Sequence, residues 1–149
     1  GPVDQQPGFQ RSPAFKQAAA CPNIHFLGVQ PYEKVPQYLA SFDACMLPYK
    51  RNEINAANYP LKVNEYLASG KLVVSTDFCQ DLEDLKEVVT LAYDVEGFEA
   101  ALDHVLTSPA SQKVERAREI ARNNSWVAKA RQMISCIESR LAILDGQPS

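Results

Sequence analysis

Hydrophobic positions along the chain fall into two alternating patterns. Short, nearly uninterrupted apolar runs, typical of strands buried on both faces of a sheet, occur at residues 23–28, 42–48, 72–75 and 88–92. Segments with helical spacing occur at residues 32–41, 60–69, 97–106, 112–123 and 125–144, and a single turn is predicted at 81–86. This alternation predicts an α/β fold, with a Rossmann-like parallel sheet and flanking helices.

The last predicted helix carries the longest apolar stripe. Its members repeat at steps of three and four, and they are Trp126, Ala130, Met133, Ile137, Leu141 and Leu144. Ser125 stands where its side chain can cap the first turn. The stripe predicts a helix face that packs on the core.

The most informative stretch joins the second and third predicted strands. Residues 49–59 are polar and include three asparagines and two basic residues, which predicts a long loop. Pro60 suits the first turn of a helix, and Gly70 suits the position just after its end. Open parallel sheets bind ligands beyond the carboxyl ends of their strands, and a helix N-terminus offers unpaired amides. We therefore expect this helix to begin at an anion, such as a phosphate.

Glu65 places a carboxylate in line with the apolar Leu61 and Ala68 on this helix. An ionised carboxylate can accept two hydroxyls of a ribose, in hydrogen bonds worth roughly 1.5–3 kcal/mol each when water is excluded. The alternative is a solvated ion pair with Lys62, worth at most ~1 kcal/mol. Spacing alone leaves both interpretations open.

Composition narrows the class of protein. The chain has 149 residues, 46% of them hydrophobic, and a net charge of −3, which together predict a soluble globular domain. A mildly acidic chain lacks the positive field that favours nucleic acid, so we expect no nucleic-acid partner. No run approaches the ~18 apolar residues of a transmembrane segment, and no secretory leader is visible, so we expect a cytoplasmic protein.

Gly1-Pro2 looks like the remnant of a cleaved tag, so residues 1–13 are interpreted as tag remnant and lead-in, and 14–149 as the domain.

Cysteine and histidine positions suggest no catalytic centre. The four cysteines are dispersed, so free thiols are expected at Cys21, Cys45, Cys79 and Cys136. We expect His25 to be a hydrogen-bonded core residue and His104 to be exposed. No Ser-His-Asp arrangement, metal-ligand cluster or Gly-rich phosphate loop is visible in the sequence, so no metal or cofactor is expected.

The run from Tyr59 to Ser75 resembles a known family signature. It reads Tyr-Pro-Leu-Lys-Val-Asn-Glu-Tyr-Leu-Ala-Ser-Gly-Lys-Leu-Val-Val-Ser, which is similar to the signature of retaining GT-B glycosyltransferases of the group 1 type, especially those of bacterial surface-polysaccharide synthesis. Leu72 stands where the family usually has proline. Residues 23–28, residues 38–48 and Ser125-Trp126 extend the likeness over roughly residues 23–144. The resemblance implies a carboxyl-terminal, donor-binding domain.

The resemblance also implies roles for individual residues. The family glutamate that matches Glu65 holds the ribose of a nucleoside diphosphate sugar, the adjoining helix start faces the diphosphate and sugar, and backbone near the glycine matching Gly28 reads the nucleobase. The residues expected at the nucleotide sugar are therefore Gly28, Asn58, Tyr59, Pro60, Leu61, Lys62 and Glu65. Lys50 and Arg51, in the preceding loop, are candidates for the diphosphate, although loop cations are more often merely solvated.

Two departures from the family pattern qualify this picture. Many relatives carry a second glutamate eight positions before the first, where this chain has Ala57; either Glu53 or a loop asparagine substitutes, or the site has degenerated. The resemblance also implies an earlier strand and helix, with a basic pair, and a separate amino-terminal Rossmann domain for the acceptor. Nothing in this chain matches them. We therefore expect no turnover by the chain alone, and an exposed sheet edge that invites dimerisation.

The sequence thus favours the donor-binding half of a glycosyltransferase that moves a hexose from a nucleoside diphosphate sugar to a glycan or lipid-linked acceptor. The full enzyme is expected in the cytoplasm, at the inner face of the membrane. The alternatives are a non-catalytic nucleotide- or protein-binding module on a degenerate Rossmann scaffold, and a regulatory domain of unrelated function. The sequence leaves the base, the sugar and the acceptor open.

Overall fold

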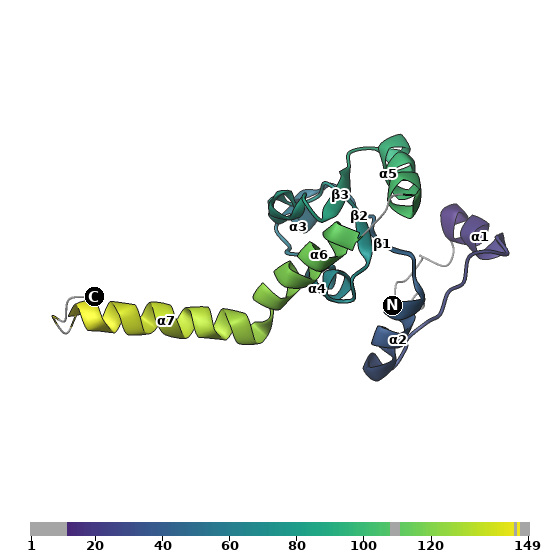
Figure 1. Ribbon diagram of the computed structural model, residues 1–149. Coiled ribbons are helices and arrows are strands. Elements are labelled where there is room, and N and C mark those ends of the chain that lie inside the picture. The colour runs from purple at the N-terminus through teal and green to yellow at the C-terminus, as the bar shows by residue number, and fades with distance from the viewer. Residues whose placement is uncertain (1–11, 108–110, 145, 147–149) are drawn as a thin grey trace. The chain divides into compact units, whose positions relative to one another are not determined.

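The computed structural model of the protein describes residues 12–107, 111–144 and 146 (Figure 1). The chain divides into two units, residues 1–38 and residues 39–149, and each is described by itself. Of the predicted lead-in, only Ser12 and Pro13 fall among the described residues.

The first unit contains one complete helix and, after an irregular stretch, the beginning of a second helical segment that continues into residues 39–41 of the second unit. Helix α1 (Pro13–Ala20) begins where the Ser12 hydroxyl accepts a hydrogen bond from the amide of Phe15, at 3.1 Å. The Phe15 ring packs on Phe26, with 4.9 Å between the ring centroids. The 3-10 turn η2 (Tyr32–Lys34) then leads into α2 (Val35–Ser41), which confirms the helix predicted at 32–41.

The strand predicted at residues 23–28 is wrong. These residues have no regular secondary structure, and Ile24, Phe26 and Leu27 are exposed. His25, predicted as a core histidine, is exposed as well. A strand requires a neighbouring backbone to which its N–H and C=O groups can bond, and the described strands pair only with one another. An apolar run predicts that a segment can be buried, but it does not supply that neighbour.

The second unit contains a three-stranded parallel sheet. Its strands are β1 (Ala44–Leu47), β2 (Leu72–Thr76) and β3 (Val89–Ala92), in the order β1-β2-β3. Cys45 lies opposite Val73, and Val74 lies opposite Thr90. The other three predicted strands and the predicted parallel sheet with flanking helices are thereby confirmed.

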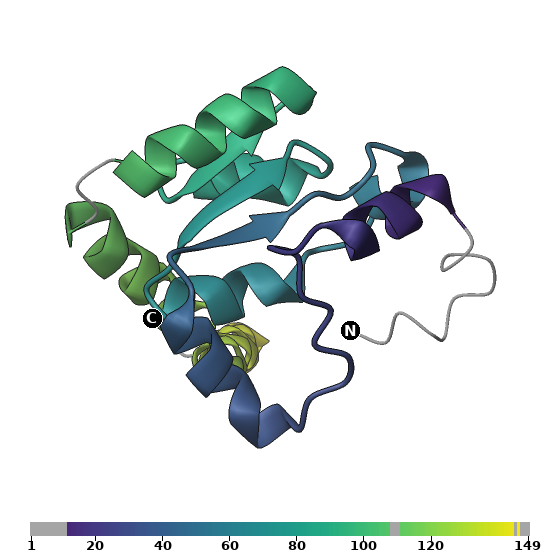
Figure 2. The ribbon, with the colours of Figure 1, turned by 90° about the vertical axis from the view of Figure 1, so that its right-hand side faces the viewer.

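Helices cover both faces of this sheet. Figure 2 shows α5 (Val95–Thr107) over one face and α4 (Leu61–Ala68) over the other. Val74 of β2 packs against Ala101 and Val105 of α5. On α4, Val63 and Leu67 are completely buried. The central strand is thus shielded on both faces, as expected for an apolar parallel strand.

Helix α6 (Ser111–Asn123) packs against α4, and its Arg118 side chain lies close to the glycine that follows α4. Gly70 ends α4 with φ +72°, a conformation that side chains rarely adopt. A Cβ at Gly70 would lie 2.7 Å from Nη2 of Arg118 on α6. Gly70 therefore ends one helix and leaves room for a guanidinium of the other.

Short turns complete the unit. The turn predicted at 81–86 is confirmed as the 3-10 helix η3 (Gln80–Leu85). The loop predicted at 49–59 needs a correction, because it contains one helical turn, α3 (Glu53–Ala56). Asn52 starts that turn: its side-chain oxygen accepts from the amide of Asn55 at 2.8 Å.

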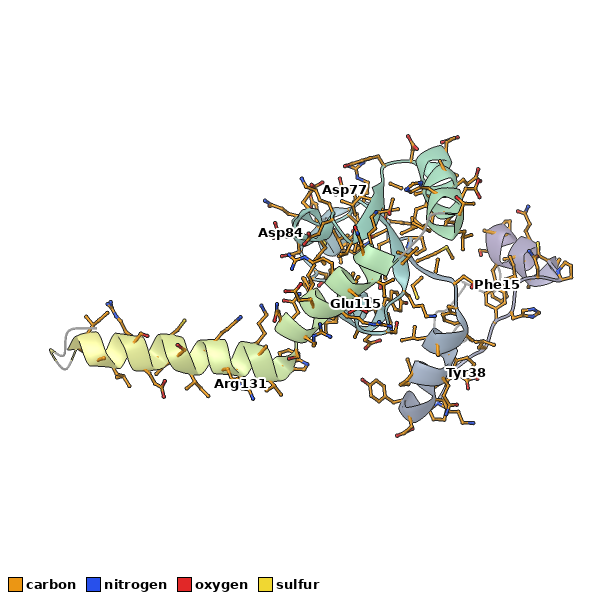
Figure 3. All side chains as sticks on the ribbon, in the orientation of Figure 1. Phe15, Tyr38, Asp77, Asp84, Glu115 and Arg131 are labelled. Carbon is orange, nitrogen blue, oxygen red and sulfur yellow. The ribbon has the colours of Figure 1, made fainter. Side chains whose placement is uncertain are left out.

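The final helix, α7 (Trp126–Leu144), confirms one prediction and corrects another. The Ser125 hydroxyl caps it, accepting from the amide of Ala128 at 3.2 Å. Its apolar stripe does not pack on the core, since none of its residues is buried, Trp126 is 81% exposed and Ile137 57%. Figures 1 and 3 show α7 running on from α6 beyond the sheet, and Figure 3 labels Arg131 on it. No described part of the second unit covers the stripe.

Candidate functional site

The strands of the second unit all end at the same edge of the sheet, and hydrogen bonds fix that edge. Thr76, at the end of β2, donates its hydroxyl to the carbonyl oxygen of Tyr49 at 2.6 Å, which ties the loop after β1 to β2. The hydroxyl of buried Ser75 donates to the carbonyl of Leu47 at 3.3 Å. The amide of Asp77 donates to the carbonyl of Ala92 at 3.0 Å, which joins β2 to β3. This edge is where a parallel sheet binds ligands.

Aromatic and charged side chains gather on the loops of this edge. The rings of Tyr49 and buried Phe78 contact each other with centroids 4.8 Å apart. Arg51 places Nη2 3.7 Å from Oδ2 of Asp77, and its guanidinium carbon lies 6.0 Å from the centre of the Tyr93 ring. Arg51, a candidate for the diphosphate, is thus held by a carboxylate and a ring at the end of the sheet.

Lys50, the other candidate cation, is exposed, and its role in the described structure comes from its backbone. Its carbonyl accepts from Nδ2 of Asn55 at 2.7 Å, which holds α3 against the loop after β1. The structure therefore brings Arg51, but not the side chain of Lys50, into the cluster with Asp77 and Tyr93.

The N-terminus of α4 has no side-chain cap, unlike those of α1, α3 and α7. Pro60 is its buried N-cap residue, with φ −78° and ψ 86°, and no side chain bonds to the first amides of the helix. By contrast, side chains cap α1, α3 and α7. Because no cap occupies them, the first amides of α4 can receive an anion.

The residues before and within α4 form a connected set. Asn58 donates from Nδ2 to the carbonyl of Ile54 at 2.8 Å, which closes α3. The Tyr59 hydroxyl donates to Oδ1 of Asn64 at 3.2 Å. Burial raises the pKa of the Tyr59 phenol, which is protonated at neutral pH even at its ordinary value of about 10, so the hydroxyl is a donor there. Leu61, at the first turn, is 62% exposed.

Glu65 lies on α4 one turn after the start of the helix. Its Oε2 is 4.0 Å from Nζ of Lys62, with the two side chains 38% and 62% exposed. The ion pair that the spacing allows is therefore present. A long pair in contact with solvent contributes little stability, and it leaves the carboxylate accessible to another partner.

Gly28 belongs to the first unit. Its φ is +66°, which favours glycine, and no atom lies within 4 Å of the position of a Cβ. The predicted site residues thus fall into three groups: Asn58 to Glu65 on one loop and helix, Lys50 and Arg51 on the loop before α3, and Gly28 in the other unit.

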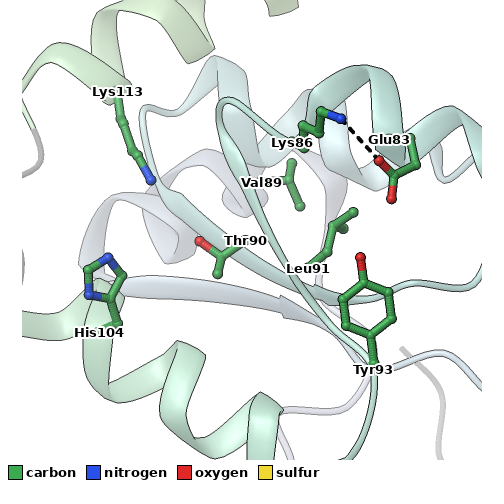
Figure 4. A pocket seen from close by; sticks show the side chains of 8 residues that line it. All are labelled: Glu83, Lys86, Val89, Thr90, Leu91, Tyr93, His104 and Lys113. Atoms are coloured by element: carbon green, nitrogen blue, oxygen red, sulfur yellow. Dashed lines mark hydrogen bonds and ion pairs between the residues drawn. The ribbon is translucent and has the colours of Figure 1, made fainter.

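A pocket of about 360 Å³ runs along the outer edge of β3, and no pattern in the sequence predicted it (Figure 4). Its lining comes from η3, β3, α5, α6 and the segments beside them: Glu83, Lys86, Val89, Thr90, Leu91, Tyr93, His104 and Lys113. Because three consecutive residues of β3 line it, the pocket lies beside the strand edge rather than over one face. No residue of α4 contributes to it. His104 is exposed, as predicted.

The thiols are free, as predicted, and two of them, Cys45 and Cys79, are buried. Burial raises the pKa of the Cys45 thiol to about 11, which keeps it protonated and unreactive at neutral pH. Within residues 12–107, 111–144 and 146, no group of three or more His, Cys, Asp or Glu side chains is arranged to hold a metal ion. In the same ranges, no helix has both the length and the apolar character needed to cross a bilayer.

Comparisons with known proteins agree on one family. The profile of the family described as Glycosyl transferases group 1 matches residues 5–108. The chain is 34% identical over 128 residues to the "Putative teichuronic acid biosynthesis glycosyltransferase TuaH" of Bacillus subtilis (strain 168). That match covers 81% of this chain and 32% of the relative, so the chain spans about a third of the relative's length. No solved structure matches.

Proposed function

Because the chain belongs to the Glycosyl transferases group 1 family, we propose that it supplies the part of a glycosyltransferase that binds the activated sugar donor. In the complete enzyme this part would hold a nucleoside diphosphate hexose. A separate amino-terminal Rossmann domain would present a glycan or lipid-linked acceptor. The chain alone would bind the donor without turnover, because the acceptor hydroxyl must be held beside the sugar for transfer.

The uncapped N-terminus of α4, one turn before Glu65, carries the proposal. Amides at a helix start favour an anion, and a carboxylate accepts hydroxyl hydrogen bonds. A diphosphate against Leu61 and Lys62 would leave the ribose within reach of Glu65. The long, solvated contact between Lys62 and Glu65 supports this arrangement, because a ligand can replace it at little cost.

Arg51 is the second support. A diphosphate at the edge of the sheet would compete with Asp77 for the guanidinium, whose present contact is 3.7 Å long. Arginine binds phosphate through two parallel hydrogen bonds, so the exchange would be favourable for the ligand. Arg51 and the α4 amides would then stabilise the departing diphosphate.

The proposed transfer is metal-independent and retains the anomeric configuration. In it, Glu65 binds the ribose and does not act as a nucleophile. Catalysis would come from orientation and from electrostatic stabilisation of the leaving group.

One observation favours the alternative of a non-catalytic module. Ala57, where many relatives have a second glutamate, is exposed at the end of α3 and has no polar side chain to contact a sugar. Glu53, at the start of the same turn, is exposed and is the nearest acidic substitute along the chain. A module of this kind would have no preference among sugar nucleotides.

Calorimetric titration separates the two functions. We expect one of UDP, GDP and ADP, or of their glucose and mannose conjugates, to bind saturably. The Glu65→Ala substitution should weaken that binding about tenfold or more, because two charge-assisted hydrogen bonds are lost. Glu99→Ala, which removes an exposed glutamate of α5, is the matched control and should bind as the parent chain does.

Glu65→Gln refines the test, since it keeps the shape and one acceptor but loses the charge. Intermediate affinity would support the ribose contact. Equal binding by the parent chain and Glu65→Ala would rule out the role of Glu65. The absence of saturable binding at millimolar ligand would contradict donor binding by this chain and favour the non-catalytic module.

A further inference from the structure

Asn64 of α4 joins two parts of the second unit that lie far apart in the sequence. Its Oδ1 accepts one hydrogen bond from the Tyr59 hydroxyl at 3.2 Å and another from Nδ2 of Asn124 at 3.3 Å. Tyr59 belongs to the loop that leads into α4. Asn124 follows the last residue of α6 and precedes the cap of α7, sixty positions along the chain from Asn64.

The chemistry of an amide makes this a defined junction. The carbonyl oxygen of an asparagine side chain has two acceptor sites, and the two donors can fill both. With both sites used, the side chain has one orientation. A tyrosine hydroxyl is protonated at neutral pH at its ordinary pKa of about 10, and burial raises the pKa of Tyr59 further, so this donor is present throughout the physiological range.

Backbone hydrogen bonds hold the segment around Asn124, the donor at the end of α6. The amide of Asn124 donates to the carbonyl of Ile120 at 2.9 Å, and the amide of Ser125 donates to that of Arg122 at 3.2 Å. On α6, Ala117 and Ala121 are buried where this helix packs against α4. Asn124 is therefore a fixed donor at the end of a well-packed helix.

Tyr59, the other donor to Asn64, is held by fewer contacts than Asn124. Tyr59 is 37% exposed, and no side chain caps the first amides of α4 two residues later. The hydrogen bond to Asn64 holds the Tyr59 side chain to the helix that it precedes. Its loss should free the Tyr59 side chain and loosen the start of α4, while Asn58 stays bonded to the carbonyl of Ile54.

We propose that Asn64 and Asn124 are positioning residues that hold Tyr59, and with it the N-terminus of α4, in the geometry that receives the donor diphosphate. The positioning is a property of the fold, whereas its effect on ligand affinity rests on the function proposed above. The two parts of the proposal need separate measurements.

Hydrogen exchange measures the first part without any ligand. Asn124→Ala and Tyr59→Phe each remove one donor, and each should speed exchange of the hydrogen-bonded amides in the first turn of α4, of which Val63 donates to the carbonyl of Pro60 at 2.9 Å, by about threefold to tenfold relative to those of β2. Asn123→Ala is the matched control, since it removes the neighbouring exposed asparagine at the end of α6. It should leave these amides unchanged.

Calorimetry measures the second part, with UDP-glucose and GDP-mannose as probes. Asn124→Ala and Tyr59→Phe should each weaken binding of the probe that the parent chain binds by about threefold to tenfold. Asn64→Asp keeps an acceptor for both donors and should leave exchange near the parent values, whereas its added negative charge near the start of α4 should weaken diphosphate binding. Asn64→Leu keeps the volume but removes the acceptor and should resemble Asn124→Ala.

Each outcome decides the proposal. Unchanged exchange in both Asn124→Ala and Tyr59→Phe would overturn it, and these two variants suffice if Asn64→Leu does not fold. Faster exchange with unchanged affinity would overturn the positioning of the donor. If the parent chain binds none of UDP, GDP, ADP and their glucose and mannose conjugates, the proposed function fails, and faster exchange in the variants would still establish the junction.

Discussion

Helices α4 and α7 have the same kind of amphipathic sequence but different surroundings. α4 is eight residues long, and Val63 and Leu67 on it are completely buried. α7 is nineteen residues long and has no buried residue. The difference is that α4 lies between the sheet and α6, while no described element of the second unit covers the stripe of α7. A stripe therefore predicts which face a helix can bury, and a tertiary neighbour decides whether it does.

The largest effect that this comparison predicts is on α4. Leu67→Ala should lower the free energy of unfolding by roughly 2–5 kcal/mol, because it opens a cavity between α4 and the sheet. Denaturant titration, with the slope of the transition checked for constancy, measures the change. Leu61→Ala, on the exposed part of the same helix, is the control and should cost much less. Equal losses in the two variants would contradict the packing of α4.

A smaller effect is expected where α4 ends. Gly70→Ala should lower the free energy of unfolding by about 1–2 kcal/mol. The positive φ strains any residue with a Cβ, and the new Cβ would also have to displace the guanidinium of Arg118. The same substitution in an Arg118→Ala background separates the two causes, since only the backbone strain remains there. If Gly70→Ala is as stable as the parent chain by thermal and chemical denaturation, α4 does not end in the left-handed conformation.

The smallest effect is expected on α7. Ile137→Ala should change the free energy of unfolding by no more than about 0.5 kcal/mol, since the side chain is more than half exposed. The measurement is the same denaturant titration as for Leu67→Ala. A loss comparable to that of Leu67→Ala would show that the stripe is covered in solution, and a dependence on protein concentration would assign the cover to a second copy.

The fold was predictable where a local sequence signal favours an element and the rest of the domain also supplies a neighbour for it to pack or bond against. Val73 and Val74 form the centre of β2, Gly70 ends α4, and Ser125 caps α7, each by a signal that its own neighbourhood contains. The run at residues 23–28 and the stripe of α7 fail for one reason: their burial depends on a partner that lies elsewhere. The turn α3 was missed although Asn52 is a recognisable N-cap residue, because the surrounding asparagines favoured a loop.

The candidate site was predictable only along single elements. The pair of Lys62 and Glu65 follows from helical spacing, and the structure contains it. The contacts of Arg51 with Asp77 and Tyr93, and of Asn64 with Asn124, join residues from different elements. Spacing within one segment contains no information about such contacts, because they depend on how separate helices and loops pack together.

The parallel order of the sheet has a consequence for synthesis on the ribosome. Strand β1 ends at Leu47, whereas its partner β2 begins at Leu72, so the two cannot close as a hairpin. At roughly 5–20 residues per second, β1 leaves the exit tunnel a few seconds before β2 follows. In that interval its backbone is unpaired and its apolar side chains are uncovered. A nascent-chain chaperone that recognises extended apolar segments would have this interval in which to bind β1, and release would be timed by the emergence of Thr76.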